Sequence, residues 1–235
     1  MKETKQIVVL TGAGISAESG LKTFRDADGL WEGHDVTAVA SPEGWYRDQK
    51  LVLDFYNQRR KQALSVAPNA GHQALAQLED SYKVSVITQN VDNLHERAGS
   101  ANVLHLHGEL SKVRSTIDEE LVYELDGWEL KRGDLCEKGS QLRPHIVWFG
   151  EAVPMMNHAA DLVQSADLLM VVGTSLQVYP AAGLINFADR NIPIIIVDPF
   201  IPEIGTRPNL HMIEAAASIG VPKAVTLIQM LLSER

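Results

Sequence analysis

The sequence predicts an α/β fold, a Rossmann-like doubly wound parallel sheet with a smaller inserted lobe. Three observations predict it: short apolar runs rich in β-branched residues, helical patterns between them, and two polar stretches that break the alternation. Continuous apolar runs suit strands that are buried on both faces of a parallel sheet covered by helices. Alternating strands and helices favour right-handed crossovers. The runs cover residues 6–10, 83–88, 167–173 and 193–198.

The helical patterns lie between and after these runs. DQKLVLDFYNQRRKQALS, residues 48–65, has a helical pattern, and residues 69–82 lead into the second apolar run. The latter segment places an apolar stripe on one helix face. PKAVTLIQMLLSE, after Gly220, predicts a final helix. The stripe consists of Ala70, Ala74, Leu75 and Leu78.

The chain is expected to form one catalytic domain, residues 1–235, with two lobes. Two polar stretches, approximately 28–66 and 111–145, lack clear strands and are interpreted as inserts that form the small lobe. The first holds a helical pattern, and the second is interpreted as loops with a small amount of strand. The large lobe then takes approximately 1–27, 67–110 and 146–235. A cleft between two lobes is a common place for a substrate.

Composition narrows the classes of partner. The net charge of −9 argues against general nucleic-acid binding, because phosphate recognition needs a basic surface. No apolar run approaches the ~20 residues of a membrane-spanning helix. The single cysteine, Cys136, excludes a disulfide within the chain, and MKETKQ is not a signal-peptide pattern, so a cytoplasmic location is expected. The sequence gives no signal for an oligomeric state.

A glycine-rich turn follows the first apolar run. Gly12 and Gly14 allow a tight turn and close backbone approach to a dinucleotide pyrophosphate, and the next helix offers free N–H groups. The pattern alone is a weak signal, because a plain strand–helix turn has similar residues. A dehydrogenase also needs an acidic residue that ends a second strand ~20 residues on. Here that position falls in the polar FRDADGLWEG, residues 24–33, which weakens a hydride-transfer interpretation.

Five ordered blocks identify a family resemblance that spans nearly the whole chain. The sequence resembles the sirtuins, NAD-dependent protein-lysine deacylases, and most closely their compact bacterial forms. The resemblance implies that NAD is a consumed cosubstrate and acylated-lysine proteins are the partners. The acyl oxygen attacks C1′ of the nicotinamide ribose, and the products are nicotinamide, lysine and O-acyl-ADP-ribose. The blocks are GAGISAESGLKTFRDADGLW, QNVDNLHERAG, LHLHGEL, RPHIVWFGE and GTSLQVYP.

The resemblance assigns the catalytic roles. His107 corresponds to the family's general base, and an imidazole suits this role because its pKa lies near neutrality. His105 would share a face with His107 in an extended segment, so imidazole chemistry alone does not choose between them. Asn90 and Asp92 are assigned to the nicotinamide side and Gln89 to the ribose. A simple capping turn is the alternative explanation for these polar residues.

The remaining NAD contacts are also expectations from the resemblance. Arg25 can approach phosphate, and Phe24 can shield C1′ from water. Asp198 stands where the family usually has Asn, and its carboxylate should favour NAD over NADP. Ala217 matches a backbone contact to the adenine end. The other expected contacts are Gly12, Ala13, Gly14, Ser16, Glu18, Trp31, Gly173, Thr174 and Ser175.

Two segments are expected to bind the acylated substrate. The segment Val147, Trp148, Phe149 and Gly150 resembles one that pairs with the substrate backbone as an added strand, which makes sequence preference loose. A buried core strand over 146–149 is the alternative interpretation.

Tyr56 and Arg59 lie at i and i+3 of the expected helix, so both can point into an acyl pocket. An Arg fork binds carboxylates, and a Tyr adds a donor. The pair matches sirtuins that remove succinyl and malonyl groups, and acetyl removal is expected as well. The alternative is an ordinary surface arginine beside Arg60 and Lys61.

The structural zinc of the family is expected to be absent. Most sirtuins hold zinc with two Cys-x-x-Cys pairs, but here 115–118 reads STID and 136–139 reads CEKG. One thiolate cannot rebuild a tetrahedral site. The sequence therefore predicts a small lobe that is held by packing and hydrogen bonds.

Three other functions are compared with lysine deacylation. Mono-ADP-ribosyl transfer would use the same cleft, but it has no use for Tyr56 and Arg59. An NAD- or ADP-ribose-binding module without turnover fits poorly with the presence of His107, Asn90 and Asp92. A dehydrogenase lacks its ribose acid. NAD-dependent deacylation is therefore the expected function.

Overall fold

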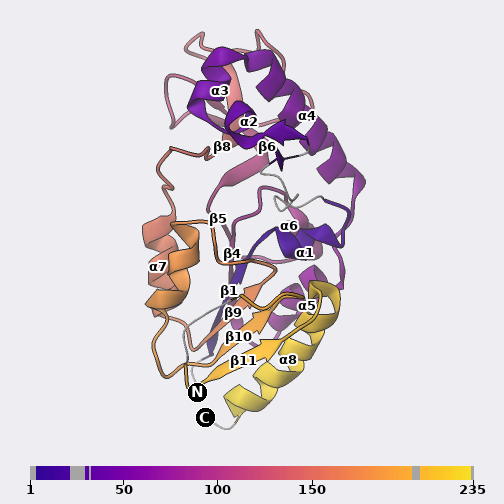
Figure 1. The fold of residues 1–235 in the computed structure, drawn as a ribbon, viewed down its shortest axis with the longest axis vertical. Coiled ribbons are helices and arrows are strands. Elements are labelled where there is room, and N and C mark those ends of the chain that lie inside the picture. The colour runs from indigo at the N-terminus through magenta and orange to yellow at the C-terminus, as the bar shows by residue number, and fades with distance from the viewer. Residues whose placement is uncertain (1–3, 22–29, 32, 203–206, 234–235) are drawn as a thin grey trace.

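The fold has two lobes, which Figure 1 shows one above the other. The computed structural model describes residues 4–21, 30, 31, 33–202 and 207–233. The large lobe contains a six-stranded parallel sheet in the order β11-β10-β9-β1-β4-β5. The strands are β1 Gln6–Thr11, β4 Lys83–Thr88, β5 Val103–His105, β9 Leu168–Val172, β10 Ile194–Val197 and β11 Leu210–Ile213.

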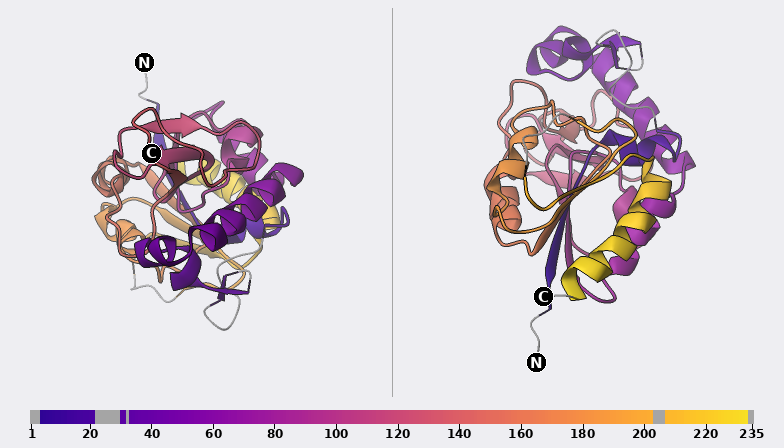
Figure 2. Two further views of the ribbon diagram at one scale, coloured as in Figure 1. Left: turned by 90° about the horizontal axis from the view of Figure 1, so that it is seen from above. Right: turned by 60° about the horizontal axis from the view of Figure 1, so that its bottom comes forward.

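Helices cover both faces of this sheet. In Figure 2, α5 and α8 lie side by side on one face, and α7 covers the other. The alternation along β1 explains the two layers: Ile7 and Val9 pack toward α5 and α8, whereas Val8 and Leu10 pack toward α7. The helices of this lobe are α1 Ala13–Ala17, α5 Ala70–Leu78, α6 Leu94–Ala98, α7 Met156–Gln164, the 3₁₀ helix η1 Ala181–Phe187 and α8 Ala217–Ser233.

The four apolar runs form four strands of the sheet, so the predicted fold class is confirmed. The sequence patterns did not reveal β5 or β11, which are the two edge strands and are short. Edge strands are only partly covered, and neither one has a fully buried residue. Their residues therefore do not form the continuous apolar runs of the central strands.

Two helix details differ from the expectation. The final helix starts at Ala217, so Pro222 lies within its first turns instead of at its start. Proline has no N–H, so at this position the helix lacks the hydrogen bond that residue 222 would otherwise donate to the backbone oxygen of Ser218. Ala70 is exposed at the start of α5, whereas Ala74, Leu75 and Leu78 are buried as expected.

The small lobe packs a three-stranded antiparallel sheet against helices. The strands β6 Gly108–Ser115, β7 Val122–Glu124 and β8 Leu142–Ile146 pair in the order β7-β6-β8. Residues 111–145 were expected to form loops with a small amount of strand, and they contain β7 and most of β6 and β8. A two-stranded hairpin, which the sequence did not reveal, also precedes the helices. The other elements are β2 Leu30–Trp31, β3 His34–Asp35, α2 Val36–Val39, α3 Pro42–Arg47 and α4 Gln49–Ser65.

Buried charges hold the small lobe together. Arg143 donates to both carboxylate oxygens of Glu151, at 2.7 and 3.0 Å, and Arg114 donates to the same carboxylate at 3.2 Å. On α4, Arg60 donates from Nε to the backbone oxygen of Leu110 at 2.6 Å. Paired guanidinium groups of this kind satisfy the polar interior of the lobe. None of the described helices is long and apolar enough to cross a membrane.

Candidate active site

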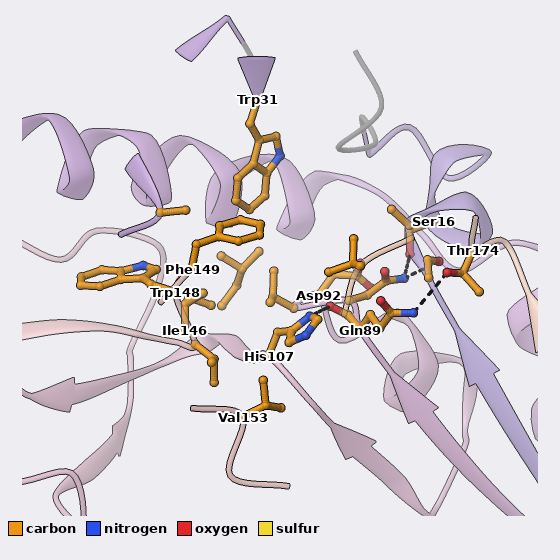
Figure 3. Close-up of a pocket in the computed structure, with 18 of the residues that line it drawn as sticks. Ser16, Trp31, Gln89, Asp92, His107, Ile146, Trp148, Phe149, Val153 and Thr174 are labelled. Carbon is orange, nitrogen blue, oxygen red and sulfur yellow. Dashed lines mark hydrogen bonds between the residues drawn. The ribbon is translucent and has the colours of Figure 1, made fainter. Parts of the chain in front are cut away.

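A cavity of about 270 Å³ is lined by residues of both lobes (Figure 3). The large lobe contributes the loops that follow the carboxyl ends of β1, β4 and β9, where ligands bind in open α/β sheets. The small lobe contributes α4 and the segment after β8. The predicted site residues that line it are Gly12, Ala13, Gly14, Ser16, Trp31, Tyr56, Arg59, Gln89, Asn90, Asp92, His107, Val147, Trp148, Phe149, Gly150, Gly173, Thr174 and Ser175.

Two strand ends meet at the glycine turn. Gly14 N donates to the backbone oxygen of Gly173 at 2.8 Å, and Gly12 N donates to that of Val172 at 3.0 Å. A Cβ on Gly12 would lie 2.7 Å from the Cβ of Thr174, and one on Gly14 would lie 2.7 Å from the Cα of Gly173. The glycines are therefore required for the contact between the β1 and β9 loops, which brings both loops to the cavity.

The segment after β4 supplies amide and carboxylate groups. The Asn90 amide donates to the backbone oxygen of Gly12 at 3.1 Å and to Ser16 Oγ at 3.0 Å. The Gln89 amide donates to Thr174 Oγ1 at 3.2 Å. These bonds tie the three loops of the large lobe to one another. Figure 3 shows Ser16, Gln89 and Thr174 gathered on one side of the cavity.

Asp92 is almost completely buried beside these groups. Its Oδ1 accepts the backbone N–H of Leu94 at 3.1 Å. Burial raises the pKa of this carboxyl, against the opposing effect of the Leu94 and Ser16 hydrogen bonds and of the charge on Arg59. A carboxyl that is held so close to the cavity is suited to contact a carboxamide.

The structure distinguishes the two histidines of the HLH segment, His105-Leu106-His107. His107 lines the cavity, and its Nδ1 bonds to the backbone oxygen of Gln89 at 3.1 Å. That bond requires the hydrogen on Nδ1, so Nε2 of the neutral ring keeps its lone pair. Burial lowers the pKa of His107 and favours the neutral base, although the Gln89 hydrogen bond opposes this. Figure 3 shows the ring facing the same cavity as Gln89 and Phe149.

His105 does not line the cavity, and both of its ring nitrogens have partners. Nδ1 contacts the backbone oxygen of Asn90 at 3.1 Å, and Nε2 contacts Glu96 Oε1 at 2.7 Å. Burial acts to lower the pKa of His105, but the Glu96 carboxylate outweighs it and the pKa is raised. A ring whose two nitrogens both have hydrogen-bond partners is a poor general base. The geometry therefore favours His107.

Aromatic and basic side chains form the small-lobe wall of the cavity. Tyr56 is fully buried, and its hydroxyl accepts the indole N–H of Trp148 at 3.1 Å. The Arg59 guanidinium carbon lies 4.7 Å from the ring centroid of Trp31. Arg59 is only 9% exposed, so the alternative of an ordinary surface arginine is wrong. Tyr56 and Arg59 face the same cavity as His107.

Residues 147–150 form the rim that the sequence assigned to the substrate backbone. The strand β8 ends at Ile146, so a core strand over 146–149 is not formed. Val147 N donates to the backbone oxygen of His107 at 2.9 Å, and Phe149 N donates to that of Ala40 at 3.0 Å. The Phe149 side chain is 46% exposed at the mouth of the cavity. The rim is thus fixed to both lobes.

Several expected contacts lie elsewhere. Glu18 accepts from the backbone and hydroxyl of Ser218, which joins α1 to α8. Asp198 is buried after β10 and accepts the backbone N–H of Phe200, and Ala217 is buried at the start of α8. Phe24 and Arg25 lie outside the described residues. Of the described positions, Glu18, Asp198 and Ala217 do not line the cavity.

The structure adds lining residues that the sequence reasoning did not single out. Val178, Tyr179 and Pro180 belong to the last sirtuin-like block, so that block was the available signal. The apolar residues Ala40 and Val153 carried no chemical signal. They line the cavity because the fold brings α2 and the segment before α7 to it.

The residues at the positions where most sirtuins bind zinc form side-chain hydrogen bonds with one another. Cys136 is buried, and its thiol donates to Ser115 Oγ at 3.3 Å. Lys138 bonds Asp118 at 2.6 Å. In the described part of the chain, no three His, Cys, Asp or Glu side chains gather as metal ligands. A third pair, Thr116 and Ser140, bonds at 2.6 Å between the hydroxyl oxygens.

The groups on the large-lobe side of the cavity fit NAD. Ribose hydroxyls and phosphates are bound by hydroxyl, amide and backbone donors. Ser16, Thr174 and Gln89 supply such groups around the two glycine loops that line the cavity.

Comparison with known proteins identifies the family. The Sir2 family model matches residues 12–180. An NAD-dependent protein deacylase of Helicobacter pylori is 58% identical over 215 residues, which cover 91% of this chain and 93% of the relative. One of Bacteroides thetaiotaomicron is 52% identical over 229 residues and covers 95% and 98%. The chain belongs to the Sir2 family.

Solved structures agree with this assignment. A mutant Sir2 homologue in complex with ADP-ribose aligns with a TM-score of 0.86 at 38% identity, over 99% of this chain and 95% of that one. A Sir2 homologue in complex with NAD also gives 0.86, at 39% identity, over 98% and 91%. A Sir2 complex with a p53 peptide and NAD gives 0.78 at 30% identity, over 97% and 95%.

Proposed function

We propose that this chain is an NAD-dependent protein deacylase that removes acetyl groups and acyl groups bearing a carboxylate, such as succinyl and malonyl, from lysine. The carrying observation is the placement of His107. Its Nδ1 is bonded to the Gln89 carbonyl, so the free Nε2 faces a cavity that also contains Asn90 and Asp92. The curated relatives above are NAD-dependent protein deacylases, and this chain matches them over nearly their whole length.

His107 acts as the general base in this proposal. Its neutral Nε2 takes a proton from a ribose hydroxyl, since burial keeps the ring uncharged at neutral pH. Asn90 and Asp92 orient the nicotinamide end, and Gln89 orients the ribose. NAD supplies the C1′ electrophile that the acyl oxygen attacks. Asp198 remains the proposed reason for a preference for NAD over NADP, because a carboxylate repels a 2′-phosphate.

The acyl preference rests on Tyr56 and Arg59. Both side chains are buried and line the same cavity as His107, on the small-lobe side. A guanidinium binds a carboxylate through paired donors, and the Tyr hydroxyl adds a third. Because Val147–Gly150 contribute main-chain groups at the rim, we propose loose sequence preference in the acyl-lysine protein substrate.

The test is mass spectrometry of the products formed from NAD with acetyl-lysine and succinyl-lysine peptides. We expect nicotinamide and the matching O-acyl-ADP-ribose from each peptide. Transfer of ADP-ribose to protein without O-acyl-ADP-ribose would instead support mono-ADP-ribosylation. Binding of NAD without release of nicotinamide would support a non-catalytic module. Either result contradicts the proposal.

We also propose that the small lobe folds without zinc. The hydrogen bonds of Ser115, Asp118 and their partners take the place of the metal ligands. Metal analysis of protein purified without added zinc should give far less than one zinc per chain, and a chelator should leave deacylation unchanged. Stoichiometric zinc would refute this proposal. The cytoplasmic location stays a prediction.

A further inference from the structure

The indole of Trp148 connects the acyl pocket to the ionic interior of the small lobe. Its Nε1–H donates to the Tyr56 hydroxyl at 3.1 Å, and both side chains are at least 98% buried. This bond was not part of the expected role of Trp148, which concerned main-chain pairing with the substrate. It gives the side chain a separate task.

Trp148 is held on several sides. The Arg143 guanidinium carbon lies 3.4 Å from its ring centroid, and the Trp45 ring lies at 5.8 Å. Its backbone N–H donates to Glu151 Oε2 at 2.8 Å, and Glu151 in turn binds Arg143. The indole therefore has little freedom to turn away from Tyr56.

The surroundings of the Tyr56 hydroxyl are rich in donors. A tyrosine hydroxyl has one hydrogen to donate and lone pairs to accept with. The Trp148 N–H occupies one lone pair of the Tyr56 hydroxyl oxygen. The charged groups that act on Tyr56 are the guanidinium groups of Arg59, Arg60 and Arg143. A guanidinium donates and cannot accept. Within the described residues, the Tyr56 hydroxyl accepts the Trp148 bond and donates no hydrogen bond of its own, so its hydrogen is available to an acceptor that a ligand brings.

We propose that Trp148 is the positioning residue for acyl selection. Its indole N–H fixes the Tyr56 hydroxyl as a donor toward the carboxylate of a succinyl-type acyl group, which Arg59 binds alongside. Acetyl has no such carboxylate, so the effect concerns charged acyl groups. This inference rests on the proposed acyl pocket.

The test compares kcat/KM for succinyl-lysine and acetyl-lysine peptides in Trp148→Phe. This change removes the N–H and keeps an aromatic ring against Arg143. We expect the succinyl-to-acetyl ratio of kcat/KM to fall about tenfold, the effect of one hydrogen bond to a charged group. Trp128→Phe makes the same change in a small-lobe indole that neither lines the cavity nor packs on Trp148, and should change the ratio less than twofold.

A double-mutant cycle separates positioning from general loosening. If Trp148 acts through Tyr56, then Trp148→Phe should change the ratio less than twofold in a Tyr56→Phe background. An equal fall in both backgrounds, or an equal fall in Trp128→Phe, overturns the inference. If Trp148→Phe does not fold, a benzothienylalanine at position 148 keeps the ring shape and removes only the N–H. It should give the same fall.

Arg59→Met distinguishes failure of this inference from failure of the proposed acyl specificity. An unchanged ratio in Arg59→Met means that the carboxylate is not bound here, and both statements fail. A fall in Arg59→Met with no fall in Trp148→Phe contradicts only the role of Trp148.

Discussion

The two lobes both bury polar side chains, but the large lobe buries an uncharged chain of hydrogen bonds and the small lobe a charged one. In the large lobe, His95 Nε2 contacts Thr11 Oγ1 at 3.0 Å, and Thr11 donates to Thr88 Oγ1 at 2.9 Å. Thr88 also accepts the backbone N–H of Asn90 at 3.0 Å. A second buried ring, His72, lies 4.9 Å from His95 between ring centroids.

The small lobe instead places Arg114 and Arg143 on the single carboxylate of Glu151. Removal of one member of a buried ion pair leaves a charge without compensation, which costs more than the pair contributes. The threonine and histidine chain behind the NAD side of the cavity is therefore neutral, whereas the acyl side is supported by a cluster of ions. The two sides should therefore respond differently to pH and to single substitutions.

The largest expected effect concerns the large-lobe side of the cavity. His107→Ala should lower kcat by about 10²–10⁴-fold for acetyl and succinyl peptides alike, because the proposed general base is lost. The measurement is steady-state kinetics with both peptides. His105→Ala is the matched control, since this ring does not line the cavity, and a loss below about tenfold is expected. A larger loss in the control would reassign the base.

The second prediction separates the lobes by pH. Burial lowers the pKa of His72 to about 4 and that of His95 to about 3, below their ordinary value of 6.5. The unfolded chain therefore binds these protons first, so stability is present above pH 6.5 and is lost as the pH falls. The slope is about 1.4 kcal/mol per pH unit for each ring.

Denaturant unfolding at pH 7 and pH 5.5 measures this loss, and about 2.5 kcal/mol is expected for the two rings together. The ion cluster should be unaffected in this window. Burial opposes ionisation of Glu151, but the bonds from Arg143 and Trp148 hold its pKa below the ordinary 4.5, so its contribution disappears only at lower pH. Histidine NMR signals provide the check: His72 or His95 rings that titrate near pH 6.5 would contradict the prediction.

The smallest effect tests the ionic interior of the small lobe. Glu151→Gln keeps the shape and removes the charge that Arg114 and Arg143 share, and should lower the free energy of unfolding by about 2 kcal/mol. Asp54→Asn is the control, because its ion pair with Lys50 on α4 is exposed and should contribute under about 1 kcal/mol. Equal losses in the free energy of unfolding would mean that the Glu151 cluster stabilises the fold no more than an exposed ion pair does.

The same comparison explains which features could be predicted from the sequence. The central strands β1, β4, β9 and β10 were predictable, because apolar side chains cover both faces. The turn glycines and the HLH segment were predictable from ordered motifs. The choice of His107 over His105 from chemistry alone was not, because it depends on Glu96, which reaches His105 from another element.

The small lobe was harder to predict for a related reason. The sequence of β6 reads GELSKVRS, where charged residues alternate with apolar ones, and its buried arginine is paired with a glutamate 37 residues away. Hydrophobicity does not report such a partner. The bond from Trp148 to Tyr56 likewise spans 92 residues, so only the folded chain reveals it.

Two neighbouring carbonyls anchor the two histidines of the HLH segment. Gln89 O contacts His107 and Asn90 O contacts His105. These bonds couple the position of the His107 imidazole to that of the Gln89 and Asn90 side-chain amides. A displacement of these groups would alter proton transfer and NAD contact together. Tyr56 and Arg59, the side chains proposed to bind the acyl group, lie on a different element, α4. Under the proposed function, acyl scope can diverge by changes in one helix while the reaction chemistry stays intact.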